Sequence, residues 1–203
     1  MKVKSFKIKW VRLVAVILIV ILLLNTANIA RLFYPVRYMN HIKQYASEYN
    51  VDPYLVMSII KTESNFDETA VSKKNASGLM QIIEPTALWL AERMGLSDFT
   101  YDRITEPELN IQMGCYYISY LLTLYDGNEK NALAAYNAGD GTVDRWLANS
   151  DYSKDGITLS NVPYPETRKY ITKVMNHRRI YRLLYRLRSA TALSALLPEG
   201  GPV

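Results

Sequence analysis

The chain has 203 residues, 49% of them hydrophobic, which suits one sizeable domain with appendages and excludes a disordered composition. Its formal net charge of +5 originates at the N-terminus, because residues 1–37 hold seven Lys or Arg and no acidic residue. The remaining 166 residues carry 17 basic against 19 acidic side chains, a balance that removes the main support for nucleic-acid binding.

The N-terminal segment indicates membrane targeting. An apolar run covers residues 13–24 and extends with milder flanks over 10–30, about the 20 residues that a transmembrane helix needs. Five cations precede this run: Lys2, Lys4, Lys7, Lys9 and Arg12. No small-x-small cleavage site or lipoprotein cysteine follows, so we expect an uncleaved, single-pass anchor in the cell membrane, with the N-terminus cytoplasmic and the domain on the outer, wall side. Residues 1–37 are predicted to hold a cytoplasmic stub, this anchor and a short connector.

Residues 53–63 are predicted to form a buried helix that ends at a carboxyl group. Asp52 is a typical N-cap, and Pro53 suits the first helical position. Apolar residues recur along one helical face, and Glu63 continues that face. Because burial disfavours a carboxylate relative to the neutral acid, the pKa of Glu63 is expected to rise towards neutrality, as a general acid requires. From this stretch alone, a helix end whose Glu63 carboxyl reaches solvent is an equally good interpretation.

Residues 38–188 are predicted to form one mainly helical domain. The expected helices cover residues 38–49, 53–63, 86–94, 107–125, 131–137 and 166–187, with a short helix around 143–147. An apolar stripe of the 107–125 helix is expected to face the core: Leu109, Met113, Tyr117, Tyr120, Leu121 and Leu124. Cys115, which has no cysteine to pair with, is predicted to be a core residue, and residues 189–203 a flexible tail.

The sequence indicates no metal and no organic cofactor. His41 and His177 lie outside any metal-ligand spacing. Residues 151–156 resemble the start of a calcium-binding loop, but the twelfth position of that loop is Val162 instead of a bidentate glutamate. A surface turn is the better interpretation of this segment.

Four ordered motifs give the strongest indication of function. They are Glu63-Ser64-Asn65-Phe66, Gly78-Leu79-Met80-Gln81, Ala135-Tyr136-Asn137-Ala138-Gly139 and Glu166-Thr167-Arg168-Lys169-Tyr170. In this order they resemble the soluble-lytic-transglycosylase (SLT) family of peptidoglycan-cleaving enzymes, over roughly residues 40–185. The resemblance implies a mainly α, lysozyme-like fold, with a small β element left open, and cleavage of the β-1,4 bond between N-acetylmuramic acid and N-acetylglucosamine in the bacterial cell wall.

The resemblance also implies roles for individual residues. Glu63 matches the family's catalytic acid, which protonates the glycosidic oxygen and then acts as a base while the muramyl 6-hydroxyl attacks, leaving a 1,6-anhydro sugar. The substrate's own acetamido group assists, so neither a second carboxylate nor a cofactor is needed. Substrate binding is implied for Ser72, Met80, Gln81, Tyr136, Asn137, Glu166 and Tyr170. For each of these, above all Met80 and Tyr136, packing in the core is the competing interpretation.

Two other functions remain open from the sequence. A muramidase would use water and a second carboxylate such as Asp67, Glu68 or Glu84. A non-catalytic, membrane-tethered scaffold would bind glycan without cleaving it. The expected partners are glycan strands and the membrane, without nucleic acid, whereas the physiological role, endo or exo action and protein partners are left undetermined by the sequence.

Overall fold

The computed structural model describes residues 10, 13–17, 19–22 and 25–185. The chain divides into two compact units, residues 1–35 and residues 36–203. The first unit contains α2 (Thr26–Phe33). Within the described residues, no helix combines the length and the apolar character needed to cross a membrane. The predicted anchor at 10–30 includes positions outside the described residues, and the predicted tail at 189–203 lies wholly outside them.

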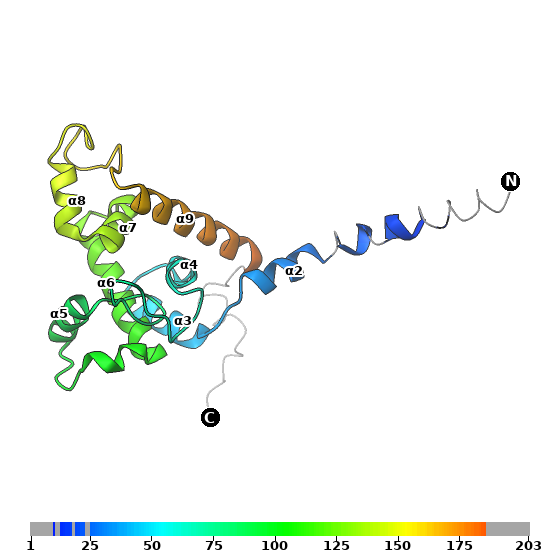
Figure 1. Cartoon of the computed structure of the whole chain (residues 1–203), viewed down its shortest axis with the longest axis horizontal. Helices are drawn as coiled ribbons and strands as arrows, with labels where there is room; N and C mark the ends of the chain where they lie inside the picture. The colour runs from blue at the N-terminus through cyan, green and yellow to red at the C-terminus, as the bar shows by residue number, and fades with distance from the viewer. Residues whose placement is uncertain (1–9, 11–12, 18, 23–24, 186–203) are drawn as a thin grey trace, which may run out of the picture. The chain divides into compact units, whose positions relative to one another are not determined.

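The second unit is helical, as the sequence predicted (Figure 1). In chain order its elements are α3 (Met39–Glu48), α4 (Pro53–Glu63), α5 (Glu84–Met94), the 3-10 helix η1 (Tyr101–Thr105), α6 (Pro107–Leu124), α7 (Glu129–Ala138), α8 (Asp140–Leu147) and α9 (Pro165–Tyr185). α9 packs against α4 and α7, while α6 packs against α3, α5 and α7. The described part of this unit has no strand, only isolated β-bridges such as Val71 with Ser77 and Ser77 with Ile82.

α4 forms the centre of the core. Asp52 caps its N-terminus by accepting a hydrogen bond from the Tyr54 backbone N–H at 3.0 Å, and Pro53 occupies the first turn. The six side chains from Leu55 to Ile60 are each at most 1% exposed, so this helix is buried around its whole circumference. The helix therefore carries Glu63, at its C-terminal end, to the edge of the core.

The prediction for the buried side of α6 was partly wrong. Met113 and Leu121 are buried as expected, and so is Cys115. Leu124, however, is 43% exposed, and Leu109, Tyr117 and Tyr120 are only partly buried. The fully buried positions also include Asn110, which the apolar stripe does not contain. The buried face of α6 therefore differs from the predicted one. Tyr117 and Tyr120 lie beside α5, where the Trp89 ring contacts theirs at centroid distances of 6.3 and 5.0 Å, respectively.

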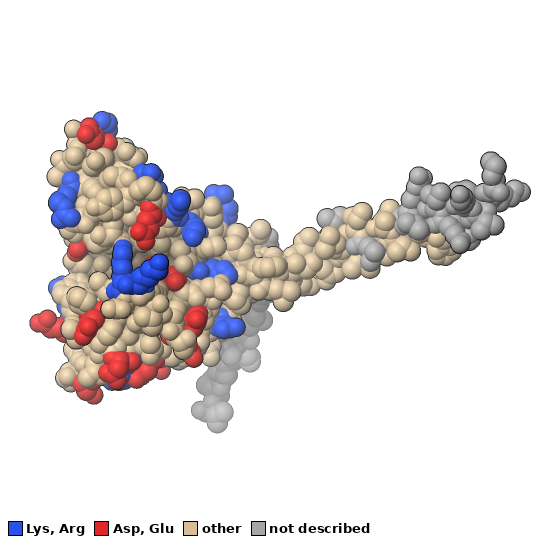
Figure 2. Space-filling model, in the orientation of Figure 1, with Lys and Arg blue, Asp and Glu red and all other residues tan. Residues whose placement is uncertain are grey.

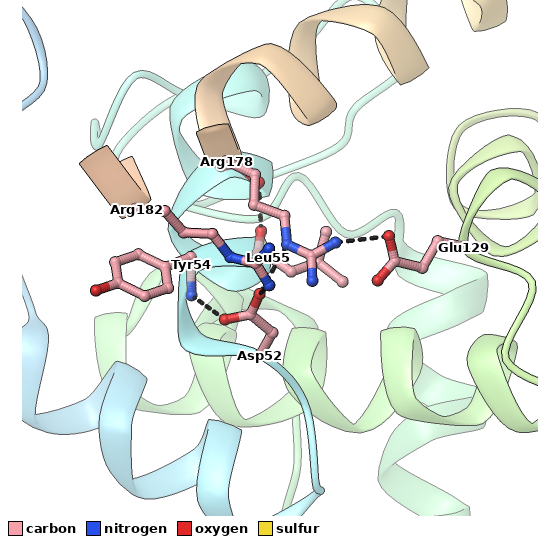
Figure 3. A network of polar contacts seen from close by, with 7 residues as sticks. Asp52, Tyr54, Leu55, Glu129, Arg178 and Arg182 are labelled. Atoms are coloured by element: carbon pink, nitrogen blue, oxygen red, sulfur yellow. Dashed lines mark hydrogen bonds and ion pairs between the residues drawn. The ribbon is translucent and has the colours of Figure 1, made fainter. Parts of the chain in front are cut away.

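An ion-pair network fastens α9 to the start of α4. α9 is rich in Lys and Arg, and cationic side chains gather along it on the face shown in Figure 2. Arg178 binds Asp52 and Glu129 at 2.7 and 2.6 Å, and Arg182 adds a second contact to Asp52 at 2.7 Å (Figure 3). Because Asp52 also caps α4, one carboxylate joins the helix terminus to α9.

Arg178→Met is expected to destabilise the domain by about 2 kcal/mol, since it leaves the Glu129 carboxylate without this partner while Asp52 keeps Arg182. The Arg178 side chain is only 12% exposed, so solvent replaces the lost contacts poorly. Urea unfolding of the two proteins measures the difference. The exposed neighbour Arg179 supplies the control, and an equal loss for Arg179→Met would contradict the assigned role of the network.

Candidate functional site

A cleft of about 540 Å³ in the second unit gathers most of the residues that the motifs indicated. Six of the eight predicted site residues line it: Glu63, Ser72, Gln81, Tyr136, Asn137 and Glu166. Met80 and Tyr170 do not line it and are buried. α4, the segment after it, α7 and α9 therefore bring widely separated parts of the sequence to a single concave surface.

The chain reverses sharply just after Glu63. Asn65 and Phe66 both adopt left-handed backbone conformations, with φ of 54° and 66°, which is unusual for a bulky residue such as phenylalanine. Phe66 is 1% exposed and packs edge-on against Tyr181 of α9, which offsets the strain. Ser64 donates a hydrogen bond from Oγ to the Leu79 carbonyl at 2.8 Å. The end of α4 is thereby held against both α9 and the cleft wall.

The fold raises the pKa of the Glu63 carboxyl group. Burial raises its pKa from the ordinary 4.5 to about 7, a contact with Tyr170 acts in the lowering direction, and the negative charge of Glu166 raises it. Its position at the C-terminal end of α4 also disfavours a negative charge. The side chain is only partly exposed, and its exposed part faces the cleft. A carboxyl group in this setting is substantially protonated at neutral pH.

Tyr170 lies behind Glu63 on α9. Its hydroxyl is buried and meets no acceptor at standard hydrogen-bond geometry in the described part of the chain, so its contact with Glu63 is a loose one. The contact still lowers the pKa of Glu63, whereas burial and, after it, the charge of Glu63 raise the pKa of Tyr170. The phenol ring stacks on Tyr136 at 6.4 Å with an interplanar angle of 6°. A phenol in this position can stabilise the Glu63 carboxylate once the proton has been given up.

The raised pKa of Glu63 has a consequence for stability. Because the folded value of about 7 exceeds the ordinary value of 4.5, the folded state binds more protons than the unfolded state between these pH values. The free energy of unfolding therefore falls as pH rises from about 4.5 to about 7. Glu63→Gln removes this fall, so we expect the variant to exceed the wild type in stability at pH 8 by more than at pH 4. Thermal unfolding across this range measures the difference, and a gap independent of pH would contradict the assignment.

Ser72 and Gln81 each keep one polar function free for a ligand. Ser72 Oγ accepts hydrogen bonds from the backbone N–H groups of Lys74 and Ala76 at 3.2 and 3.1 Å, so its own proton remains available to donate into the cleft. Gln81 Nε2 donates to the carbonyls of Ala70 and Gly78 at 2.9 Å each, so its side-chain carbonyl is left as an acceptor. The cleft wall thus offers a donor and an acceptor on fixed supports.

The segment around Met80 is a tight turn, with Gln81 at a φ of 51°. Packing in the core, the interpretation that competed with substrate binding for Met80, describes its side chain. The Met80 side chain is 0% exposed and fills the space above Gly114 of α6, where an added Cβ would lie 2.2 Å from its Sδ. Met80 therefore acts on the cleft through its backbone, whose carbonyl accepts the Tyr136 hydroxyl at 2.9 Å.

A buried asparagine on α6 holds this turn in place. Asn110 is 0% exposed, accepts the Met80 backbone N–H at 2.7 Å and donates to the carbonyls of Ser77 and Ile104 at 3.1 and 2.8 Å. Gly78 has a φ of 80°, and a Cβ there would lie 2.4 Å from the Asn110 amide nitrogen. The close approach of the turn to α6 thus requires glycine at this position.

Asn137 is oriented by α9. Its side-chain carbonyl accepts a hydrogen bond from Thr167 Oγ1 at 2.8 Å, and Thr167 is 1% exposed. This contact fixes the amide so that its NH2 group remains as a donor at the cleft. Glu166 precedes Thr167 and lines the cleft as an exposed side chain.

The carboxylates considered for a hydrolytic mechanism lie elsewhere. Asp67 accepts from the backbone N–H and the hydroxyl of Thr69, Glu68 accepts from the Tyr38 hydroxyl at 2.5 Å, and Glu84 is exposed at the start of α5. None of the three lines the cleft. Among the described residues, its carboxyl groups belong to Glu63 and Glu166.

The lining also includes residues that the sequence motifs did not assign to the site. They are Lys73, Lys74, Ala76, Ile82, Ile83, Thr86 and Tyr117. Tyr117 was assigned to the core, although a tyrosine in an apolar stripe often marks a wall with one wet side. The residues next to Lys73 and Lys74 in the sequence do not indicate that these lysines line the cleft, because contacts with residues distant in the sequence place their loop there.

The fold and the site together define a lysozyme-like helical domain with one half-buried acid in an open cleft. More specifically, the chain belongs to the SLT family, since the family model described as Transglycosylase SLT domain matches residues 40–158. The 70 kDa soluble lytic transglycosylase of Escherichia coli has a similar structure, with a TM-score of 0.67 and 31% identity over 78% of this chain and 26% of its own. A complex of the 70 kDa soluble lytic transglycosylase with bulgecin A is similar to this chain to the same degree, with a TM-score of 0.67 and 31% identity.

Curated relatives agree with this assignment. Soluble lytic murein transglycosylase of Escherichia coli (strain K12) is 32% identical over 151 residues, which cover 73% of this chain and 23% of that protein. Membrane-bound lytic murein transglycosylase C of Yersinia pestis (strain Pestoides F) is 31% identical over 169 residues, which cover 72% of this chain and 47% of that protein. The chain thus spans about a quarter of the soluble relative and about half of the membrane-bound one.

Proposed function

We propose that this protein is a peptidoglycan lytic transglycosylase that cleaves the β-1,4 bond between N-acetylmuramic acid and N-acetylglucosamine and leaves a 1,6-anhydro-muramyl end. The observation that carries the proposal is the cleft of an SLT-family domain with Glu63, whose pKa is about 7, and without Asp67, Glu68 or Glu84 in its lining. Besides Glu63, the carboxyl group of the described cleft lining is Glu166, which acts on Glu63 by raising its pKa. An acid that is protonated near neutral pH in this setting suits a reaction in which the substrate supplies the second group.

In this reaction, neutral Glu63 donates its proton to the glycosidic oxygen as the bond to the anomeric carbon breaks. The acetamido oxygen of the muramyl residue stabilises the anomeric carbon. The Glu63 carboxylate, which Tyr170 stabilises, then removes the proton from the muramyl 6-hydroxyl as its oxygen attacks that carbon. The proton returns to Glu63, no water is consumed, and the enzyme is regenerated.

The remaining cleft residues are proposed to position the glycan. The free proton of Ser72 suits the acetamido carbonyl, the Gln81 side-chain carbonyl suits a sugar hydroxyl or amide N–H, and the Asn137 NH2 group suits a sugar oxygen. Tyr136 supports the wall through its bond to the Met80 carbonyl. Glu166 disfavours ionisation of Glu63, and its exposed carboxylate is available to sugar hydroxyls.

The proposal extends to location and domain limits. A catalytic domain over residues 38–188 would be held at the outer face of the cell membrane by an anchor within residues 1–37. The apolar run at 10–30, the cations before it and the membrane-bound relative support this arrangement. Fractionation of cells tests it, since recovery of the protein in soluble, shortened form would argue against an uncleaved anchor.

Analysis of products tests the reaction. The full chain in detergent is incubated with purified peptidoglycan, and the released fragments are identified by mass spectrometry. Anhydro-muropeptides are the expected result. Fragments with reducing ends would instead indicate a hydrolase that uses Glu166 or a residue outside the described part of the chain. Binding of glycan without any cleavage would indicate the non-catalytic scaffold.

A further inference from the structure

Two adjacent lysines line the cleft but have no role in the proposed reaction. Lys73 and Lys74 are exposed and belong to the same concave surface as Glu63. Within residues 25–185, neither ammonium group makes an ion pair or a side-chain hydrogen bond. Both charges therefore remain available to a ligand.

The backbone that carries these lysines is held in place from several sides. Ser72 Oγ accepts the Lys74 N–H, the Tyr101 hydroxyl of η1 donates to the Asn75 carbonyl at 2.6 Å, and Gln81 donates to the Ala70 carbonyl at 2.9 Å. A loop fixed in this way loses little backbone freedom when a ligand binds. The two lysine side chains consequently extend from a backbone segment that is already ordered before a ligand binds.

The charges in the cleft are distributed unevenly. The two lysines stand on the wall formed by the loop after α4, whereas Glu166 comes from α9. Glu63 owes its raised pKa to burial and to Glu166, with Tyr170 acting in the opposite direction, so the lysines are not needed to explain it. Their charges are better explained by a negative group on the ligand than by tuning of the acid.

We infer that Lys73 and Lys74 form a carboxylate-binding site that recognises the acidic substituent of a muramyl residue in the cleft. This inference rests on the proposed function and adds a substrate preference to it. The sugar rings of the strand are neutral, and carboxylates enter through the lactyl ether, either free or extended by a stem peptide with its own carboxylates. Lysine suits such a group as a flexible point charge that follows a mobile ligand.

Binding to the full-length Glu63→Gln protein, which is not expected to consume its ligand, tests the inference. Three ligands are compared: the hexamer of N-acetylglucosamine, glycan strands stripped of peptide, which keep lactyl carboxylates, and strands with intact stem peptides. Adding Lys73→Ala and Lys74→Ala is expected to weaken binding of carboxylate-bearing strands about tenfold. The same changes should leave binding of the neutral hexamer unaltered, and Lys73→Arg with Lys74→Arg should retain affinity. Salt should weaken binding of the acidic strands most.

The charge-matched control is Lys43→Ala with Arg179→Ala, two exposed cations outside the cleft. A loss confined to peptide-free strands identifies the free lactyl carboxylate, and a loss confined to peptide-bearing strands identifies the carboxylates of the stem peptide. A loss with both acidic ligands shows that the lysines accept either carboxylate. Unchanged affinity, an equal loss for the neutral hexamer, or an equal loss in the control would overturn the lysine site alone. If the folded Glu63→Gln protein binds none of the three ligands, the proposed function fails together with the lysine site.

Discussion

Glu63→Gln is expected to lower kcat/KM for peptidoglycan cleavage by about 10³- to 10⁴-fold, because the amide can neither give a proton to the leaving oxygen nor accept one afterwards. The cleft should otherwise keep its shape, since the amide has nearly the same size. In the wild type, the rate should fall as pH rises above about 7, where Glu63 loses the proton that starts the reaction. Release of soluble muropeptides over time, measured from pH 5 to 9, gives both quantities.

Glu92→Gln provides the matched control for this prediction. Glu92 lies on α5, is exposed and does not line the cleft, so the substitution should leave the rate within about twofold of the wild type. Retention of most activity in Glu63→Gln, or a wild-type rate that stays constant across neutral pH, would show that another group supplies the proton.

Asn110→Leu is expected to destabilise the domain by about 3 to 5 kcal/mol. The leucine fits the available space approximately but leaves the Met80 N–H and the carbonyls of Ser77 and Ile104 without the partner that Asn110 provides. Each buried polar group that loses its hydrogen bond costs about 1–3 kcal/mol. Because the turn around Met80 forms the cleft wall, glycan affinity should fall together with stability. Urea unfolding and glycan binding at low temperature measure the two effects.

The comparison uses Asn176→Leu, an exposed position on α9 whose side chain makes no described contact. This variant should change stability by less than about 0.5 kcal/mol. A similarly small effect at Asn110 would mean that water or a rearranged backbone can replace its hydrogen bonds, and that the turn is held mainly by Gly78 and the packing of Met80.

The parts of the fold and site that are determined locally could be predicted from the sequence. α4 was predicted with its observed ends because Asp52, Pro53 and the apolar spacing act within a few residues of one another. The same spacing placed Glu63 at the edge of the core, where burial controls its pKa. The other α-helices between residues 36 and 185 were predicted with ends within three residues of those observed, since caps and periodicity are also local signals, whereas the 3-10 helix η1 was not predicted.

Features that depend on distant partners could not be predicted. Met80 is buried because Gly114 leaves room for it, and the two are separated by a helix and a connector. In the sequence, Asn110 is a polar residue near the start of an apolar helix. Its role as a hydrogen-bond partner of the turn at Gly78 is seen only in the folded structure, where that turn packs against it. The lysines of the cleft wall are placed by Tyr101 and Gln81 in the same non-local way.

The raised pKa of Glu63 also bears on how this domain can evolve. The carboxyl destabilises the folded state above neutral pH, whereas a neutral amide of the same shape would not. Under the proposed function, selection for cleavage keeps the acid in place, and a lineage released from that selection would gain stability by losing it. A homologue with glutamine at this position and an intact cleft is therefore expected to bind glycan without cleaving it.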